Sequence, residues 1–320
     1  MVKALAPGFV LTVVLGILSY FISTIHDSLD ALVVALILGM MLRLVFGGSP
    51  RFSLVVAYAK DIKDVLIPIA VLLYSMTINI NKALTLSTSA YMHTLVSLAV
   101  LLGVALIVGR LLRLPQKTSW LTAIGSAICG ASAIAISSTA VNAKDEDVSN
   151  SLVAITLVGL LAVGVYQYLP AVTSLTDDNF AVLSGATLQQ TGLVKIATAG
   201  LGDIQKNIAL PVKVLRTALI PFVALFFFYL TVQREGYKKH TGYLLTVLLA
   251  FIIILYFAAF FPAFAGLSKI KWVKVAATVI FSIAFANLGL LVDFRSLKFG
   301  PIITALLAWG AALAVFLQMV

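Results

Sequence analysis

SWLTAIGSAICGASAIAISSTAV, residues 119–141, is the stretch of this sequence that decides the fold. It is long and apolar enough to cross a bilayer, because a hydrocarbon core of about 30 Å needs roughly 20 residues of helix. Small and hydroxyl-bearing residues nevertheless gather at its centre, where residues 125–132 read GSAICGAS. Glycine weakens a helix, and hydroxyls offer backbone groups other partners. We therefore predict a membrane segment that is interrupted near its middle.

A second stretch, FAVLSGATLQQTGLVKIATAG at residues 180–200, has the same character. It adds two adjacent glutamines, Gln189 and Gln190, and the cation Lys195. Close helix packing through small residues is common in membranes, but it does not account for two amides and a lysine. Interrupted helices persist in a bilayer only where protein or a water-filled cavity satisfies the freed backbone groups. A pair of such segments in the two halves of a chain indicates the binding site of a transporter.

The rest of the chain is almost continuously apolar. Of its 320 residues, 62% are hydrophobic and only 11% are charged, whereas a soluble domain is about half apolar and a quarter charged. We predict an all-α polytopic membrane protein with 10–11 transmembrane helices in a single integral domain, residues 1–320. The expected segments are 8–25, 29–46, 64–81, 90–112, 119–141, 148–170, 180–200, 208–232, 241–262, 272–292 and 300–320.

The charged residues exclude several classes of function. The formal charge of +10 comes mostly from Lys and Arg in short turns between apolar segments, where they set topology, so we expect no nucleic-acid partner. The sequence has one cysteine, Cys129, and its three histidines are far apart, so we expect no metal site and no cofactor. GSAICG lacks the spacing of a nucleophile elbow. We expect a protein that is not an enzyme.

All twelve acids fall in predicted loops or within about a turn of a segment end, which argues against a carrier that binds cations through a buried carboxylate. Two cations, Lys195 and Arg216, lie instead within apolar surroundings. Each either extends to the membrane surface or faces a cavity. Another cation, Lys213, lies near the start of the segment 208–232 and is counted with the cations of the preceding loop.

These features suggest a small anion as the cargo. Breaks at 125–132 and 185–192 would direct the N-termini of half-helices into a cavity, where their N–H groups favour anions. The candidate binding residues are Ser126, Cys129, Gly130, Ser132, Thr187, Gln189, Gln190, Thr191, Lys195 and Arg216. Two alternatives stay open: a carrier that holds Na⁺ through carbonyls and hydroxyls, and a channel or structural membrane protein.

Residues 117–159, KTSWLTAIGSAICGASAIAISSTAVNAKDEDVSNSLVAITLVG, resemble the signature of the YeiH-type family of proposed sulfate exporters. Shorter matches are GAT at 185–187, KVLR at 213–216, PF at 221–222 and FANLGLLVDFRSLKFGP at 285–301, which adds Asn287 to the candidates. The resemblance implies a prokaryotic carrier in the cytoplasmic membrane, with inverted repeats and two crossing discontinuous helices. It belongs to the larger group of sodium/proton antiporters and bile-acid symporters, so Na⁺ or H⁺ could be the coupling ion. We leave a homodimer open.

The sequence departs from this family pattern at two places. Relatives typically carry a His-Glu pair where this chain has Gln189 and Gln190, and an Arg near Thr77, which we add to the candidates for that reason. Gln-Gln keeps the capacity to form hydrogen bonds but cannot change its charge, which puts proton coupling through this pair in doubt.

Overall fold

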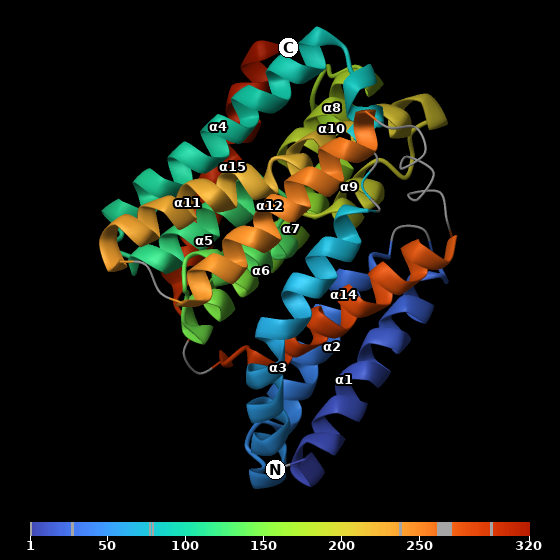
Figure 1. Ribbon diagram of the computed structural model, residues 1–320. Coiled ribbons are helices and arrows are strands. Elements are labelled where there is room, and N and C mark those ends of the chain that lie inside the picture. Colours follow the sequence, from blue (N-terminus) through green and yellow to red (C-terminus); the bar gives the residue numbers. More distant parts are fainter. Residues whose placement is uncertain are drawn as a thin grey trace. The chain divides into compact units, whose positions relative to one another are not determined.

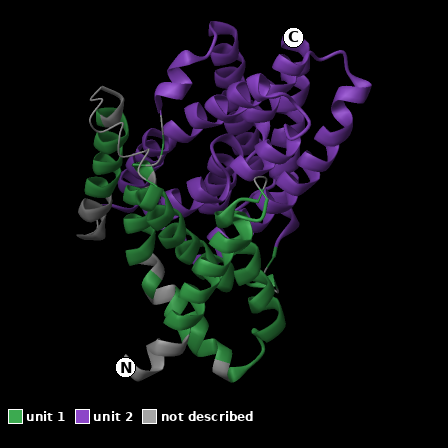
Figure 2. Cartoon of the chain, turned by 90° about the vertical axis from the view of Figure 1, so that its right-hand side faces the viewer, with its two compact units in different colours: residues 1–78, 238–297 green, residues 79–237, 298–320 purple. Residues whose placement is uncertain are grey.

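A computed structural model describes residues 2–26, 29–76, 78, 80–236, 239–260, 271–294 and 297–320. Within these ranges all regular secondary structure is helical, which confirms the all-α prediction. The chain divides into two compact units (Figure 2). Unit 1 is Met1–Ile78 with Lys238–Leu297, and unit 2 is Asn79–Tyr237 with Lys298–Val320. That residues 1–320 act as one transport domain stays a prediction.

Unit 1 is built around a helix near the end of its sequence. α14 (Lys271–Leu291) packs against α1 (Val2–Ser23), α2 (Ala31–Phe46) and α3 (Pro50–Ser75), and α12 (Lys239–Phe260) packs against α3 (Figure 1). α2 and α14 meet at two glycines: a Cβ atom on Gly39 would lie 2.4 Å from the carbonyl oxygen of Ala286, and one on Gly289 would lie 2.3 Å from that of Leu36. Small residues therefore let the two backbones approach closely.

Unit 2 holds both predicted interruptions. Its elements are η1 (Ile80–Thr85), α4 (Thr88–Leu111), α5 (Gln116–Ala127), α6 (Ala131–Ala140), α7 (Asp145–Val172), α8 (Asp177–Thr187), α9 (Thr191–Ala197), α10 (Asp203–Ala218), α11 (Ile220–Glu235) and α15 (Phe299–Met319). α5 packs against α4 and α7, α10 packs along α8, and α15 packs against α4 and α7. Segments 119–141 and 180–200 are thus each split into two helices, as predicted.

Five stretches of helix in the described part of the chain are long and apolar enough to cross a membrane. They are Thr88–Leu111, Asp145–Val172, Asp203–Glu235, Lys271–Leu291 and Phe299–Met319, and shorter apolar helices accompany them. This pattern is that of a multi-pass membrane protein. The internal inverted repeat stays a prediction.

Two predicted boundaries are wrong. The third segment was expected to start at residue 64, but α3 starts at Pro50, because the charged residues between 60 and 64 do not end a helix. The segment 208–232 is two helices, since α10 ends at Ala218 and α11 begins at Ile220, with Pro221 in its first turn. Proline is favoured in the first turn of a helix and disfavoured further inside, which accounts for this division.

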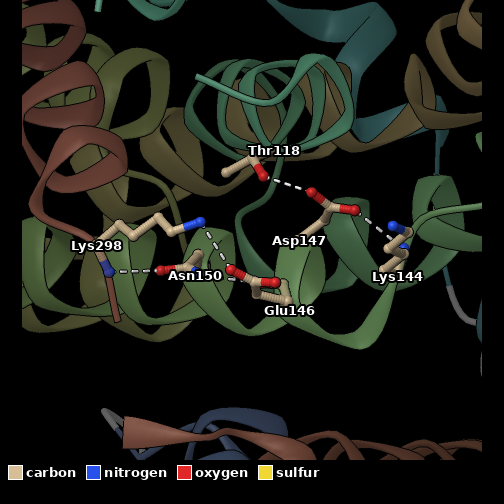
Figure 3. A network of polar contacts seen from close by, with 6 residues as sticks. All are labelled: Thr118, Lys144, Glu146, Asp147, Asn150 and Lys298. Carbon is tan, nitrogen blue, oxygen red and sulfur yellow. Dashed lines mark hydrogen bonds and ion pairs between the residues drawn. The ribbon is translucent and has the colours of Figure 1, made fainter. Parts of the chain in front are cut away.

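A polar network joins three helix starts at one end of unit 2 (Figure 3). The buried carboxylate of Asp147, in the first turn of α7, accepts hydrogen bonds from the Thr118 hydroxyl of α5 at 2.5 Å and from the Lys144 backbone N–H at 3.0 Å. Lys298, just before α15, donates from its backbone N–H to Asn150 at 2.7 Å and from its ammonium group to Glu146 at 2.8 Å. The network fixes the start of α5, and with it the approach to the first break.

Candidate functional site

The first break separates α5 from α6 by three residues, 128–130. α5 ends at Ala127, and Ile128 leaves the helical conformation with φ −105° and ψ −97°. Gly130 then adopts φ +71° and ψ −126°, after which α6 begins at Ala131. L-residues with a side chain rarely adopt this conformation, so the glycine allows the chain to turn back into a helix here.

The second break separates α8 from α9 by an extended segment, residues 188–190. α8 ends at Thr187, and Leu188 and Gln190 have ψ values of 140° and 146°. The helix resumes at Thr191. These three non-helical residues cannot continue the hydrogen bonds of the helix, so carbonyl groups at the end of α8 need partners from elsewhere.

The two breaks touch each other. A Cβ atom on Gly130 would lie 2.8 Å from Cγ of Gln190 and 3.2 Å from the carbonyl oxygen of Gln189. The absence of a side chain at Gly130 is what allows this approach. The predicted pair of crossing discontinuous helices is therefore present in unit 2.

Lys213 of α10 binds both breaks. Its ammonium group donates to the carbonyl oxygens of Ile128 at 2.7 Å, Leu188 at 2.9 Å and Gln189 at 2.6 Å. The side chain is 1% exposed. An ammonium group has three donors, and here a carbonyl accepts from each of them.

Arg216, one turn further along α10, binds the helix ends themselves. Its Nε donates to the carbonyl oxygen of Ala127 at 2.9 Å and Nη2 to that of Ser126 at 3.0 Å. Its Nη1 donates to Gly185 at 3.0 Å and to Leu188 at 2.8 Å. The planar guanidinium group thus joins the C-terminal ends of α5 and α8, which a single ammonium group could not do with the same geometry.

The electrostatic result is a positive site. Each break places a half-helix C-terminus, with about −0.5 of a charge, near a half-helix N-terminus with about +0.5. These partial charges nearly cancel, and the formal charges of Lys213 and Arg216 remain. In the part of the chain that the structure describes, neither cation bonds to an acidic side chain.

Two buried amides lie at the same crossing. Gln189 is 0% and Gln190 4% exposed, yet Nε2 and Oε1 of Gln189 and Nε2 of Gln190 have no hydrogen-bond partner among the described residues. The Gln189 side chain reaches α7, because a Cβ atom on Gly159 would lie 3.3 Å from its Oε1. A buried polar group without a partner costs about 1–3 kcal/mol. These atoms are therefore the clearest candidates for contacts to a ligand.

The predicted hydroxyl and thiol groups are largely engaged within the protein. Ser126 donates to the Thr122 carbonyl at 2.8 Å, and Cys129 Sγ lies 2.6 Å from Ser132 Oγ. The Thr187 hydroxyl bonds both to the Leu183 carbonyl and to the Tyr166 hydroxyl. That Ser126 and Thr187 contact a ligand stays a prediction, and their hydroxyl hydrogens would have to leave the carbonyls to which they now donate.

The remaining candidates lie elsewhere or are less enclosed. Thr191 starts α9 and Lys195 lies within it, both partly exposed. Asn287 belongs to α14 in unit 1, where its Nδ2 donates to the Ile283 carbonyl at 2.8 Å. Thr77 is outside the described residues.

Sequence reasoning missed Lys213. It was counted with the cations of a loop, and Arg216 was placed near a segment start, whereas α10 begins at Asp203 and buries both. The signal was the KVLR spacing, since residues three apart share one face of a helix. Extension of Arg216 to the membrane surface is excluded by its 0% exposure.

Comparison with known proteins supplies the family. A family model described as "Conserved hypothetical protein 698" matches residues 7–303. The chain belongs to this family. Among similar members, a UPF0324 membrane protein of Archaeoglobus fulgidus is 29% identical over 95% of this chain and 89% of its own length. A UPF0324 membrane protein of Brucella melitensis is 26% identical over 92% of this chain and 84% of its own.

The names of these relatives identify them as membrane proteins and state no activity. No solved structure matches this chain. The function of the crossing in this chain therefore has to be interpreted from its own chemistry.

Proposed function

We propose that the crossing in unit 2 binds a small anion, sulfate-like or organic, and that the protein is a secondary transporter that carries it by alternating access. The observation that supports this most is the pair of fully buried cations, Lys213 and Arg216, without an acidic partner among the described residues. We further propose that the protein is not an enzyme, and that it lies in the cytoplasmic membrane.

The cations would act on an anion through their charge, since most of their donors bind carbonyl groups. Direct hydrogen bonds would come from Nε2 of Gln189 and Gln190, which are buried and unpartnered in the described structure. The N-terminus of α6, a ten-residue helix next to Gly130, adds backbone N–H groups as further donors. An oxyanion offers several acceptors in a small volume, which suits this set of donors.

The same geometry disfavours Na⁺. A hard cation needs oxygen ligands, but the carbonyl oxygens of residues 126, 127, 128, 185, 188 and 189 already accept hydrogen bonds from Lys213 or Arg216. A further positive charge at roughly 5 Å from each would cost about 3 kcal/mol per cation with an effective dielectric constant near 20.

Flux of labelled sulfate and of small organic anions into proteoliposomes tests the proposal. We expect saturable uptake above that of protein-free vesicles, and loss of uptake in Gln189→Met and Gln190→Met. Gln318→Met is the matched control, because Gln318 lies exposed at the end of α15. Sodium flux without anion dependence would support a sodium carrier instead, and flux far above the turnover of carriers would support a channel.

A further inference from the structure

A second charged site lies at one end of unit 2, away from the crossing. A groove of about 690 Å³ runs between α4 and α11, with Ser119 and Trp120 of α5 among its lining residues. Trp120 and Ser119 are buried, and the Trp120 ring packs against Phe227 with centroids 5.2 Å apart. The three helices that line the groove are labelled in Figure 1.

The groove is polarised along its length. Ile107 and Phe226, 62% and 56% exposed, lie on its apolar part. Arg110, Gln116 and Arg234 line the end where α4 and α11 finish and α5 begins. An elongated molecule with an apolar chain and a polar head would match this order.

The charge at the polar end is positive. Arg234 lies over the Trp120 ring at 5.8 Å, and neither it nor Arg110 forms an ion pair with any described residue. Lys117, nearby in sequence, is by contrast paired with Glu235 at 2.7 Å. None of the described residues that line the groove is acidic. Two guanidinium groups without an ion-pair partner among the described residues suit a phosphate, which arginine binds through paired hydrogen bonds.

We propose that this groove binds an anionic phospholipid, with the phosphate between Arg110 and Arg234 and an acyl chain along Ile107 and Phe226. The bilayer supplies both chemical parts in one molecule and at the right depth. The excess of Lys and Arg in the adjoining turns is typical of the cytoplasmic side, whose leaflet carries anionic lipid. The lipid stabilises the packing of α4, α5 and α11 around the start of α5.

Thermal unfolding of the full chain in mild detergent tests this proposal. Phosphatidylglycerol is expected to raise the Tm by several degrees more than phosphatidylcholine does, and high salt should reduce the difference. Arg110→Gln combined with Arg234→Gln should abolish the difference. Arg113→Gln should retain it, because Arg113 is exposed in the same turn but does not line the groove. Ile107→Trp, which fills the apolar part, should weaken stabilisation by either lipid.

Several results would overturn the proposal. One is equal stabilisation by the two lipids, and another is an unchanged lipid response in the Arg110/Arg234 double variant. Equal stabilisation by glycerol phosphate, which has no acyl chain, would assign the groove to a small soluble anion. Gln189→Met should keep the full lipid response, so this test is independent of the proposed transport site.

Discussion

Gln189 and Gln190 carry amide groups that the described part of the protein leaves unpartnered, although both side chains are buried. A purely structural amide would be expected to have partners, because an unmade buried hydrogen bond costs about 1–3 kcal/mol. A site that binds a polar ligand accepts this cost in the ligand-free state. Replacing these glutamines with apolar residues should therefore raise the stability of the ligand-free protein and weaken ligand binding.

Gln189→Met tests this opposition. Methionine has a similar shape and no amide. Without substrate, we therefore expect the variant to unfold at the same Tm as the parent or at a higher one, with an unfolding free energy up to about 1 kcal/mol larger. The same variant should lose transport and the stabilisation that the transported anion gives to the parent. Unfolding scans with and without anion measure both effects. A large loss of stability in the absence of anion would instead assign Gln189 a structural role.

Lys213 should have the opposite character. Lys213→Met leaves the buried carbonyls of Ile128 and Gln189 without their donor, while the Leu188 carbonyl keeps its bond from Arg216, and we expect a loss on the order of 2–3 kcal/mol in unfolding free energy. Lys206→Met is the control on the same helix, because the Lys206 side chain is 40% exposed and its ammonium group lies 4.0 Å from the Asp203 carboxylate. Thermal unfolding in detergent provides the comparison. Equal stability of the two variants would contradict the inference that Lys213 holds the breaks together.

At this scale the sequence predicted the amides and Arg216 as candidates, but not Lys213. The amides were recognisable because two adjacent glutamines are unusual inside an apolar segment. Lys213 was missed because its role depends on where α10 begins, and polar residues such as Asp203, Gln205 and Lys206 at its start resemble a loop. Which hydroxyls bind their own helix also depends on backbone geometry that composition does not reveal.

The elements of the site depend most on the glycine at the first break. Gly130→Ala places a methyl group 2.8 Å from Gln190 Cγ and imposes φ +71° on an L-residue. We expect a loss of about 1–2 kcal/mol from the backbone conformation alone, with transport abolished because the breaks are forced apart. Transport assays and thermal unfolding measure the two effects.

Gly164→Ala is the matched control within α7. No described atom lies within 4 Å of a Cβ atom added there, so alanine should be tolerated and can stabilise the helix by up to about 1 kcal/mol. If Gly130→Ala transported as well as Gly164→Ala, the contact between the breaks would not matter for function.

Helices as units were predicted well, and their ends less well. The two interruptions were recognisable from glycines and hydroxyls in otherwise apolar segments. The division at Leu219 was missed although Pro221 marks it, because the flanking residues keep an apolar pattern on both sides. That the breaks touch was expected from the family resemblance and not from the residues alone, since contacts distant in sequence leave no local pattern.

For the whole molecule, the presence of Gln189 and Gln190, and of no pair of acidic or histidine side chains among the described residues of the crossing, predicts transport that is not coupled to protons. Gln189 and Gln190 cannot exchange protons, and Lys213 needs its proton for the hydrogen bonds it donates. We expect a pH gradient across proteoliposomes to leave anion uptake unchanged, and an inside-positive membrane potential to increase it. A fluorescent pH indicator inside the vesicles measures proton movement directly. Proton uptake in proportion to anion uptake would contradict this prediction.

Composition was sufficient to predict a multi-pass helical membrane protein, because few other structures can bury so continuous an apolar sequence. The division into two compact units was not predictable. Unit 1 and unit 2 are each assembled from segments distant in the sequence, and the polar stretches at the changes between them, such as residues 233–240, resemble the other turns between helices.

One helix, α10, carries both cations that bind the breaks, and this constrains how the protein can move. Seven hydrogen bonds from a single rigid rod reach both interrupted helices. Separating the breaks would disrupt most of them at once, so displacement of α10 carries α5 and α8 along with it. A cycle that exposes the anion to alternate sides would then keep its binding residues fixed as one body. In the proposed transport cycle, the path to either side would therefore open around α5, α8 and α10 and not between them.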